Sequence, residues 1–395
     1  MRSTRLAILS ILALSLSATV TAAGQEKVLY SFNDNGVDGY SSESGLIFDS
    51  SGNLYGTTIF GGTYGYGTVF ELTPKAGGTW TEKVLHSFDN SSADGGYPGA
   101  GVIFDSSGNL YGTAEVGGNY DDGTVFELTP QADGSWTEKV LHSFNSKSKD
   151  GVAPSSVLTF DASGNLYGTT SSGGAAACSY NVYGCGTVFE LTPKAGGTWG
   201  EKVLHSFSDA ATDGFSPLYE GVIFDALGNL YGTTRFGGTG DCGGGGLLLH
   251  CGIVFELTPK ASGGWSEKAL YRFRDNGADG IFPSGNLIFD AAGDLYGTTL
   301  DGGAYTTGGT VFELMPKASG SWSEKVLHSF KSSSSTDGSE PYAGLIFDSM
   351  GNTGRRCSAV PTVTGPCSSS RLNRARRGCY ITSAMALTDQ NPSPA

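Results

Sequence analysis

The stretch LIFDSSGNLYGTTIFGGTYGYGTVFEL, residues 46–72, decides the fold because the chain repeats it. Copies of it begin at five later positions, the last of them interrupted: Val102, Leu158, Val222, Leu287 and Leu345. The spacing between equivalent residues of successive units is 56 to 66 residues. Self-similarity at such a period is the signature of a repeat architecture, so the number of repeats replaces the number of domains in the analysis.

Each unit predicts four short strands. Apolar residues 46–48 begin the first strand, and DSSGN, residues 49–53, predicts a tight reversal. The reversal has a cause, since an Asp side chain can bond the backbone ahead of it and Gly or Asn tolerates positive φ. Residues 54–58, 67–72 and 80–88 supply the other three strands, which are rich in β-branched and aromatic residues. The unit is therefore expected to be a four-stranded antiparallel meander.

The start of the chain predicts a closed ring. EKVLYSF, residues 26–32, matches the fourth strand of later units, although no complete unit precedes it. A lone fourth strand at one end can complete the last blade of a propeller. The strands are apolar on both faces, as blades packed between neighbours require. We predict an all-β fold, a β-propeller of about five complete four-stranded blades with a truncated sixth; an open β-solenoid is the alternative.

The order EKVLYSF, DG, LIFDxxGNLYGTT, GG and GTVFELTP resembles the tandem GloVer repeat of secreted bacterial proteins, often described as choice-of-anchor proteins. The resemblance covers residues 26–352. It implies an exported, propeller-like protein that a separate C-terminal device attaches to the cell surface. It implies no reaction, because no established biochemical activity accompanies the repeat.

The N-terminus predicts export. Two arginines precede an apolar run at residues 6–16, and small residues near Ala22 and Ala23 offer a cleavage site. Residues 1–23 are therefore read as a signal peptide, and the apolar run is too short to span a membrane. Residues 24–352 carry 16 basic and 37 acidic residues, a charge of -21. This acidic body argues against nucleic acid as a partner, which would need basic patches.

The last part of the chain departs from the repeat. The sixth unit continues normally to Asn352, but residues 353–395 show no strand pattern and contain six arginines. Codons chosen for TGRRCSAVPTVTGPCSSS, read one nucleotide earlier, give YGTTMQRGAYGYGTVFE, which is the missing continuation. We interpret residues 353–395 as a frameshifted and disordered tail, and expect the first strand, residues 28–32, to lack its main pairing partner.

Two cysteine pairs flank insertions at the same place in units three and four: Cys178 with Cys185, and Cys242 with Cys251. Paired cysteines at loop bases of an exported protein predict two local disulfides. A zinc site is the alternative, with His250 as its one candidate partner and no CxxC motif in the chain. No metal and no cofactor is predicted.

Antiparallel order brings the insertions and the DG links between units to one face, which we call the loop face. There the position after GT[TA] breaks the repeat and supplies Glu115, Arg235 and, one residue further on, Asp301. Two carboxyls and an arginine could act on a carbohydrate, although charged residues at strand ends usually form a solvated rim. The DG links also offer calcium candidates, while turn formation explains them without a metal. These candidates are Asp34, Asp38, Asp275 and Asp279.

Two functional classes follow. The first is an exported, monomeric, non-enzymatic repeat protein that binds an extracellular polysaccharide or a surface protein through the loop face. The second is a propeller glycoside hydrolase or lyase that acts on extracellular polysaccharide. The absence of a concentrated catalytic motif favours the first, and the carboxyls on one face keep the second open.

Overall fold

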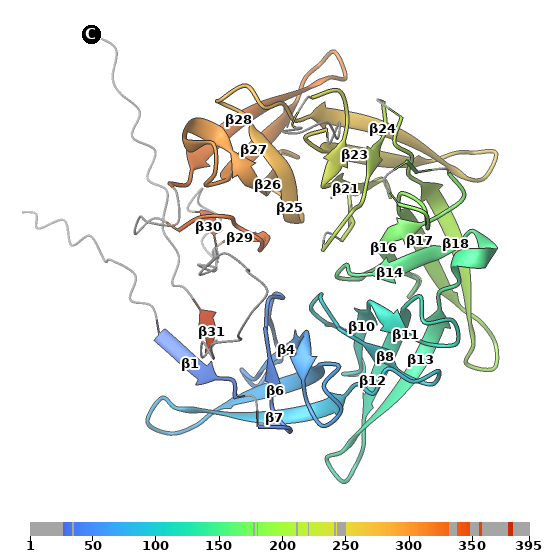
Figure 1. Cartoon of the computed structure of the whole chain (residues 1–395), viewed down its shortest axis with the longest axis vertical. Helices are drawn as coiled ribbons and strands as arrows, with labels where there is room; N and C mark the ends of the chain where they lie inside the picture. Colours follow the sequence, from blue (N-terminus) through green and yellow to red (C-terminus); the bar gives the residue numbers. More distant parts are fainter. Residues whose placement is uncertain are drawn as a thin grey trace, which may run out of the picture.

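A computed structural model of the chain describes residues 27–33, 35–176, 178–179, 181–210, 212–219, 221–240, 242, 250–331, 338–347, 355–357 and 378–381. Five antiparallel sheets stand in a ring, each turned so that its first strand lies nearest the axis (Figure 1); four contain four strands, and the third contains five because its first strand is divided in two. The chain is therefore an all-β propeller, as the repeat predicts. The predicted signal peptide, residues 1–23, lies outside the described residues.

The five sheets follow the predicted order of four strands per unit. From the axis outward the first two sheets contain β3 (Ile47–Phe48), β4 (Leu54–Thr58), β6 (Thr68–Pro74) and β7 (Trp80–Ser87), then β9 (Ile103–Phe104), β10 (Leu110–Ala114), β12 (Thr124–Pro130) and β13 (Trp136–Ser143). The third contains β14 (Gly151–Pro154) and β15 (Thr159–Phe160), both on β16 (Leu166–Gly173), then β17 (Thr187–Pro193) and β18 (Trp199–Ser206). The last two contain β20 (Ile223–Phe224), β21 (Leu230–Thr234), β23 (Ile253–Pro259) and β24 (Trp265–Arg272), then β25 (Gly280–Phe289), β26 (Leu295–Gly302), β27 (Thr310–Pro316) and β28 (Trp322–Ser329).

The tight reversal between the first and second strands is built by its aspartate. Asp49 Oδ1 accepts hydrogen bonds from the backbone N–H groups of Ser51 at 2.8 Å and Asn53 at 2.9 Å. Gly52 between them has φ +84°, which a residue without a Cβ adopts at little cost. The same bonds recur at four equivalent aspartates: Asp105, Asp161, Asp225 and Asp290.

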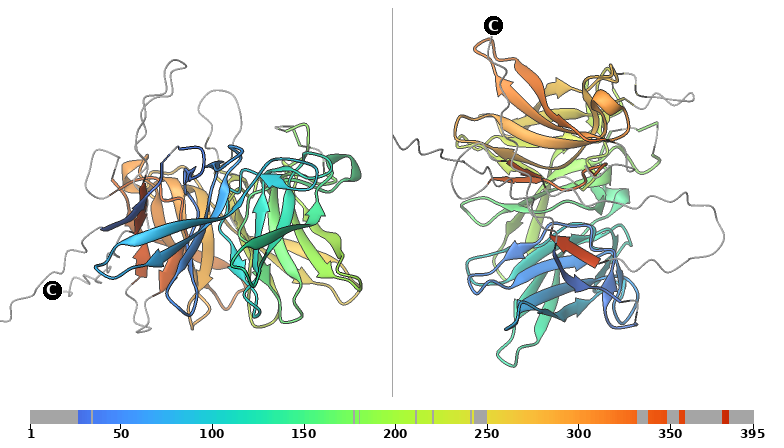
Figure 2. Two further views of the ribbon diagram at one scale, coloured as in Figure 1. Left: turned by 90° about the horizontal axis from the view of Figure 1, so that it is seen from below. Right: turned by 90° about the vertical axis from the view of Figure 1, so that its left-hand side faces the viewer.

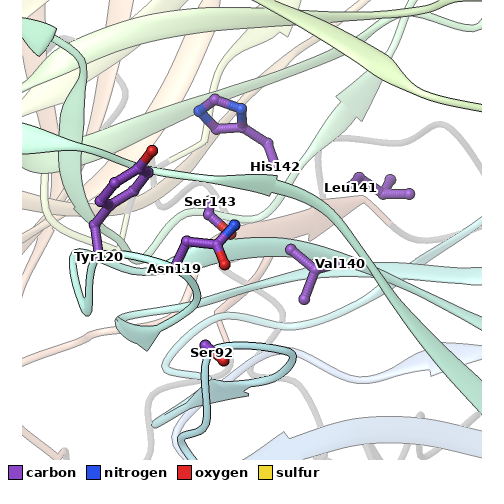
Figure 3. Close-up of a pocket in the computed structure, with 7 residues that line it drawn as sticks. All are labelled: Ser92, Asn119, Tyr120, Val140, Leu141, His142 and Ser143. Carbon is purple, nitrogen blue, oxygen red and sulfur yellow. The ribbon is translucent and has the colours of Figure 1, made fainter.

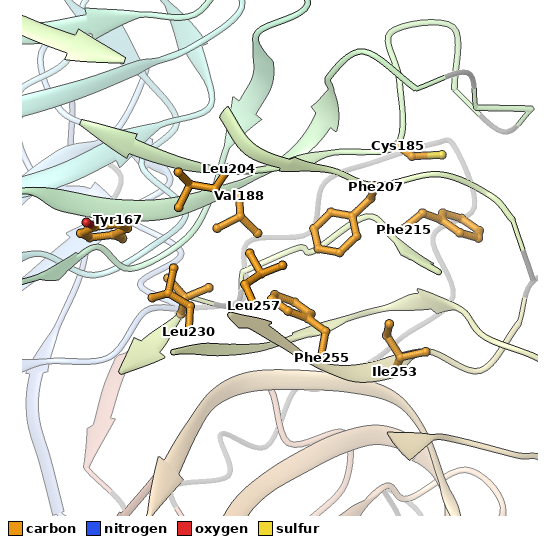
Figure 4. Packing of buried hydrophobic residues seen from close by; sticks show 11 residues of the cluster. Tyr167, Cys185, Val188, Leu204, Phe207, Phe215, Leu230, Ile253, Phe255 and Leu257 are labelled. Carbon is orange, nitrogen blue, oxygen red and sulfur yellow. The ribbon is translucent and has the colours of Figure 1, made fainter. Parts of the chain in front are cut away.

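The sheets are buried on both faces. Val69 and Phe70 point to opposite sides of β6, and both are fully buried. Between the third and fourth sheets, Val188 and Phe207 pack against Phe255 and Leu257 of the next blade (Figure 4). Burying a large apolar side chain contributes about 1.5–3 kcal/mol, so these layers between blades stabilise the ring.

The DG links contain short strands, whereas the sequence predicted loops there. In the first, second and fourth units they form two-residue strands that pair beyond the second strand: β2 (Gly39–Tyr40) with β5 (Phe60–Gly61), β8 (Gly95–Gly96) with β11 (Val116–Gly117), and β19 (Gly214–Phe215) with β22 (Phe236–Gly237). They extend the innermost strand, which is continuous only in β25. The sequence did not indicate these strands because glycine has low β-propensity.

The sixth position of the ring differs from expectation. Between the fifth and first sheets lie two short pairs: β29 (Leu345–Phe347) with β30 (Arg355–Cys357), and β1 (Lys27–Ser31) with β31 (Gly378–Ile381) (Figure 1). The expectation that the first strand lacks a partner is therefore wrong, and two described stretches of the tail are strands. Unpaired strand edges offer free N–H and C=O groups that favour such pairing. The rest of residues 353–395 lies outside the described residues.

Only two helical turns occur in the described part of the chain, the 3-10 turns η1 (Ser146–Ser148) and η2 (Gly303–Tyr305). Neither turn could cross a bilayer, and the described residues contain no other helix that could. Figure 2 shows the thickness of the ring, with the strands running between its two faces.

Candidate functional site

The residues that break the repeat lie where the second strand meets the loop face. The backbone N–H of Glu115 bonds the carbonyl of Tyr97 at 3.3 Å, and that of Arg235 bonds the carbonyl of Ser216 at 3.1 Å. Both acceptors belong to the innermost segment of the same blade. These bonds hold the backbone of Glu115 and Arg235 against the innermost segment of the blade, beside the axis. The two residues therefore do not lie on the outer rim of the ring.

A tyrosine of the fourth unit joins Glu115. The link SPLYEG, residues 216–221, has one residue more than the equivalent YPGAG, residues 97–101. Within it Tyr219 has φ +65°, a left-handed conformation that side chains rarely adopt. A methyl group at Gly99 would lie 2.8 Å from Glu115 Oε1 and 3.0 Å from Tyr219 Cε1. The inserted tyrosine therefore comes from the fourth blade to the carboxylate of the second.

Arg235 is placed on the same axis. Its guanidinium carbon lies 5.5 Å from the centroid of the Phe236 ring, a cation–π distance. Its positive charge acts on Asp301, Tyr219 and Tyr342. Arg235 Nε is buried and has no hydrogen-bond partner among the described residues. An unpaired buried donor of this kind is a group that a ligand can satisfy.

Six side chains from five units thus meet at the axis, and we call them the axial cluster. They are Glu43, Glu115, Tyr219, Arg235, Asp301 and Tyr342. Its carboxyls outnumber its single arginine. The cluster is consequently an acidic, half-buried site with one positive group.

Burial changes the protonation of the axial cluster. It raises the pKa of Glu115 to about 7, and the carboxylate of Glu43 adds to this rise. Burial, with the charges of Glu115 and Glu43, raises the pKa of Tyr219 to about 12, while Arg235 opposes that shift. Burial also raises the pKa of Asp301, and Arg235 again opposes it. Glu115 can therefore hold or release a proton near neutral pH.

The three catalytic candidates from the sequence all lie in the axial cluster. Arg235 acts directly on Asp301, whereas Glu115 is joined to Arg235 through Tyr219. Sequence reasoning missed Glu43, Tyr219 and Tyr342. The one-residue insertion in the fourth link was a signal for Tyr219, because an insertion in a repeat marks a local departure from the common structure.

The calcium candidates have other partners. Asp38 accepts hydrogen bonds from the Tyr30 hydroxyl at 3.1 Å and the Asn33 N–H at 2.9 Å. Asp279 is bound in the same way by the Tyr271 hydroxyl at 2.8 Å. Asp275 is exposed, and Asp34 lies outside the described residues. Within the described ranges no three His, Cys, Asp or Glu side chains gather as metal ligands would.

The two predicted disulfides are present. Cys178 is bonded to Cys185, and Cys242 to Cys251, each with a Cα–Cα distance of 5.2 Å. They close the two insertions of the loop face beside the third strands of their blades. A thiol pair bonded in this way is not available as a zinc ligand.

Enlarging Gly99 should disturb the axial cluster. We expect Gly99→Ala to destabilise the chain by about 1 kcal/mol, since the new methyl group presses on the edge of the Tyr219 ring, while the flexible end of the Glu115 side chain can move away. Urea unfolding measures the effect. Gly45→Ala is the matched control, because a Cβ at Gly45 meets nothing within 4 Å. Equal stability of the two variants would show that the Tyr219 ring does not pack against Gly99.

The family model of the Gloeobacter/Verrucomicrobia repeat matches residues 17–244 and 176–353, which together include nearly all of the propeller. The chain belongs to this repeat family. Membership accounts for the repeated blades, and the axial cluster contains residues that depart from the repeat within this chain. No curated protein matches it.

Several solved structures are similar to this chain at low identity. A putative oxidoreductase (glucose dehydrogenase) from Thermus thermophilus is 14% identical over 83% of this chain and 92% of its own, with a TM-score of 0.44. A luciferin-regenerating enzyme is 14% identical over 90% and 94%, with a TM-score of 0.48. The RS223 β-xylosidase is 13% identical over 76% and 98%, with a TM-score of 0.37. Likeness at this level carries no inference about activity.

Proposed function

We propose that this protein is an exported, non-enzymatic repeat scaffold that binds an extracellular polysaccharide or surface partner through its loop face. The observation that carries the proposal is the convergence of repeat-breaking polar side chains from five units at one end of the axis. A repeat built for stability alone would place equivalent residues there. Variable residues on a rigid scaffold are the usual means of recognition.

Two further observations support binding outside the cell. Both insertions of the loop face are closed by disulfides, which persist in oxidising compartments. The buried Nε of Arg235 and the partly buried carboxyl of Glu115 are polar groups held ready at the axis. Clusters of ionisable groups with perturbed pKa values are typical of binding or catalytic sites.

Substitution of the axial arginine tests the proposal. We expect Arg235→Ala to weaken binding of the polysaccharide ligand found on a glycan array by roughly 10–100-fold, because hydrogen bonds to charged groups contribute about 1.5–3 kcal/mol. Arg274→Ala is the matched control, since Arg274 is exposed and lies in a link outside the axial cluster. Unchanged affinity in Arg235→Ala would exclude the axial cluster as the binding site.

A glycoside hydrolase or lyase is the second candidate, and the protonation of Glu115 favours it. A carboxyl with a pKa of about 7 beside a tyrosine can donate or accept a proton at neutral pH. A reducing-sugar assay on the bound polysaccharide separates the two functions. Turnover that Glu115→Gln reduces at least about 100-fold would establish catalysis, in line with the usual contribution of general acids. Binding without turnover would support the scaffold.

A further inference from the structure

A solvent-exposed tyrosine recurs in the loop between the second and third strands. Tyr64, Tyr120 and Tyr305 each stand two residues after a Gly-Gly pair, and their exposed fractions are 59%, 55% and 48%. Tyr183, 57% exposed, lies four residues before the third strand, as do Tyr64 and Tyr120. None of the four belongs to a hydrophobic cluster of the described chain. Packing in the hydrophobic core therefore does not account for a tyrosine at these positions.

In the second blade this tyrosine borders a cavity of about 290 Å³. The cavity is lined by Ser92, Asn119, Tyr120 and residues 140–143 of β13. Figure 3 shows Asn119 and Ser143 in the middle of the lining, with Tyr120 on one side and Val140 on the other. This cavity is open to solvent and its exposed lining is mainly polar, so it suits a hydroxyl-rich ligand held beside the tyrosine ring and not an enclosed apolar molecule.

The polar side chains of this cavity differ in whether they already have a hydrogen-bond partner in the described chain. His142 Nε2 lies 2.9 Å from Asp150 Oδ2, so the imidazole is held by the protein. The side chains of Asn119 and Ser92 make no hydrogen bond with the described part of the chain, and both can meet a ligand. An amide and a hydroxyl are neutral donors and acceptors, which suit sugar hydroxyls.

One part of this lining, the His-Ser pair, recurs around the ring. His-Ser ends the fourth strand in the first, second, third and fifth blades, at 86–87, 142–143, 205–206 and 328–329. In three blades the serine hydroxyl holds the tyrosine loop, through the N–H of Thr63 at 3.4 Å, Ala175 at 3.1 Å and Ala304 at 3.2 Å. In the first and fifth blades the bonded residue directly precedes the loop tyrosine, Tyr64 or Tyr305, whereas Ala175 lies eight residues before Tyr183.

Charge restricts the ligand. Residues 24–352 carry 16 basic and 37 acidic residues, a charge of -21, which repels anionic polymers. A neutral sugar ring can lay its apolar C–H face on a tyrosine while its hydroxyls bond polar neighbours. A neutral glycan therefore fits both the charge of the body and the chemistry of the cavity.

We propose that the exposed loop tyrosines form a set of equivalent subsites, each binding one sugar unit of a neutral polysaccharide, apart from the axial cluster. The inference rests on the proposed function, in which the loop face binds ligands, and adds the ligand class and the number of contacts. A single shallow subsite is weak, whereas several that engage one polymer raise its avidity by about 10²–10⁴-fold.

Affinity electrophoresis in gels that contain galactomannan, mixed-linkage β-glucan or dextran tests the subsites, with alginate as the anionic comparison. We expect retardation by at least one neutral polymer and none by alginate. Tyr64→Ala, Tyr120→Ala or Tyr305→Ala alone should weaken retardation a few-fold, and the triple variant at least about 100-fold, because subsites on one polymer act together. Thermal melting of each variant confirms that it is folded.

Two controls separate this inference from the proposed function. Phe48→Ala removes an aromatic ring of similar exposure, 64%, that lies on the first strand and not in a loop, and it should leave retardation unchanged. Arg274→Ala should also leave it unchanged, because Arg274 is an exposed link residue outside both the axial cluster and the tyrosine loops. Retardation of the triple variant within twofold of the parent, or no retardation by any neutral polymer, overturns the subsites. Loss of glycan-array binding in Arg235→Ala would in either case still support the proposed function.

Discussion

A chain in which YGTTMQRGAYGYGTVFEL follows Asn352, in place of the present tail, is expected to melt about 10 °C higher and to aggregate less. The structure gives the reason at the junction between the sixth position and the first blade. Phe48 is 64% exposed. Its equivalents Phe104 and Phe289 pack edge to face on tyrosines of the preceding blade, with centroids 5.0 Å apart in both pairs.

The restored segment supplies the missing tyrosine at the start of YGTT and two further strands. It would cover Phe48 together with Val28 and Ile346, which are 46% and 62% exposed. Each buried apolar side chain contributes about 1.5–3 kcal/mol. One kcal/mol shifts the melting temperature by roughly 2–4 °C in domains of 150–250 residues.

A chain that carries a scrambled version of the same insert is the control for length and composition. Scanning calorimetry of the three chains measures the effect. If the repaired chain and the present chain melt at the same temperature, residues 27–31 do not help to close a six-position ring. An open arrangement of the sixth unit would then be supported. The nucleotide sequence of the gene tests the frameshift itself, because a single change of frame must restore the repeat.

Stability should also fall as the pH rises from about 5 to 9. Each fourth strand carries a partly buried glutamate with one oxygen that has no hydrogen-bond partner in the described chain: Glu82, Glu138, Glu201, Glu267 and Glu324. Burial raises the pKa of Glu138 to about 8 and that of the others to about 7. Aspartates of the preceding link add to each rise, namely Asp38, Asp94, Asp150, Asp213 and Asp279.

The sign follows from proton binding. A glutamate whose pKa is higher in the folded than in the unfolded chain binds more protons when folded, so its contribution is complete below the unfolded value of 4.5 and is lost as the pH rises through about 7 to 8. The aspartates of the tight reversals affect the stability at lower pH. Burial alone would raise the pKa of Asp49, but hydrogen bonds from Asn53 and Ser51 outweigh it and lower the value. Stability should therefore be greatest at mildly acidic pH.

Replacement of all five glutamates by glutamine tests this account. We expect the variant to melt higher than the parent at pH 8 and to show a flatter dependence on pH, since the amide keeps the shape but cannot ionise. Asp275→Asn is the control, because Asp275 is an exposed carboxylate outside the blade interfaces. If the melting temperature of the glutamine variant falls with pH as steeply as that of the parent, other ionisable groups cause the effect.

The sequence alone determined the blade. Alternating apolar residues, the Asp-to-Asn reversal and the regular return of GTVFELTP act within one unit, and local interactions decide them. The pairs Cys178–Cys185 and Cys242–Cys251 were also predictable, because each joins residues at the base of one insertion. The repeat placed Glu115, Arg235 and Asp301 on one face for the same reason.

Only the tertiary structure decided which side chains meet. Tyr219 comes beside Glu115, and Arg235 acts on Asp301, because the ring brings separate blades to a common axis. The pKa of Glu115 follows from burial and from Glu43 of another unit, and neither is visible along the chain. The pairing of β1 with β31 likewise depends on which free edge lies nearby. Contacts between blades join residues far apart in sequence, so they depend on the radius and closure of the ring, whereas the turns depend only on their own residues.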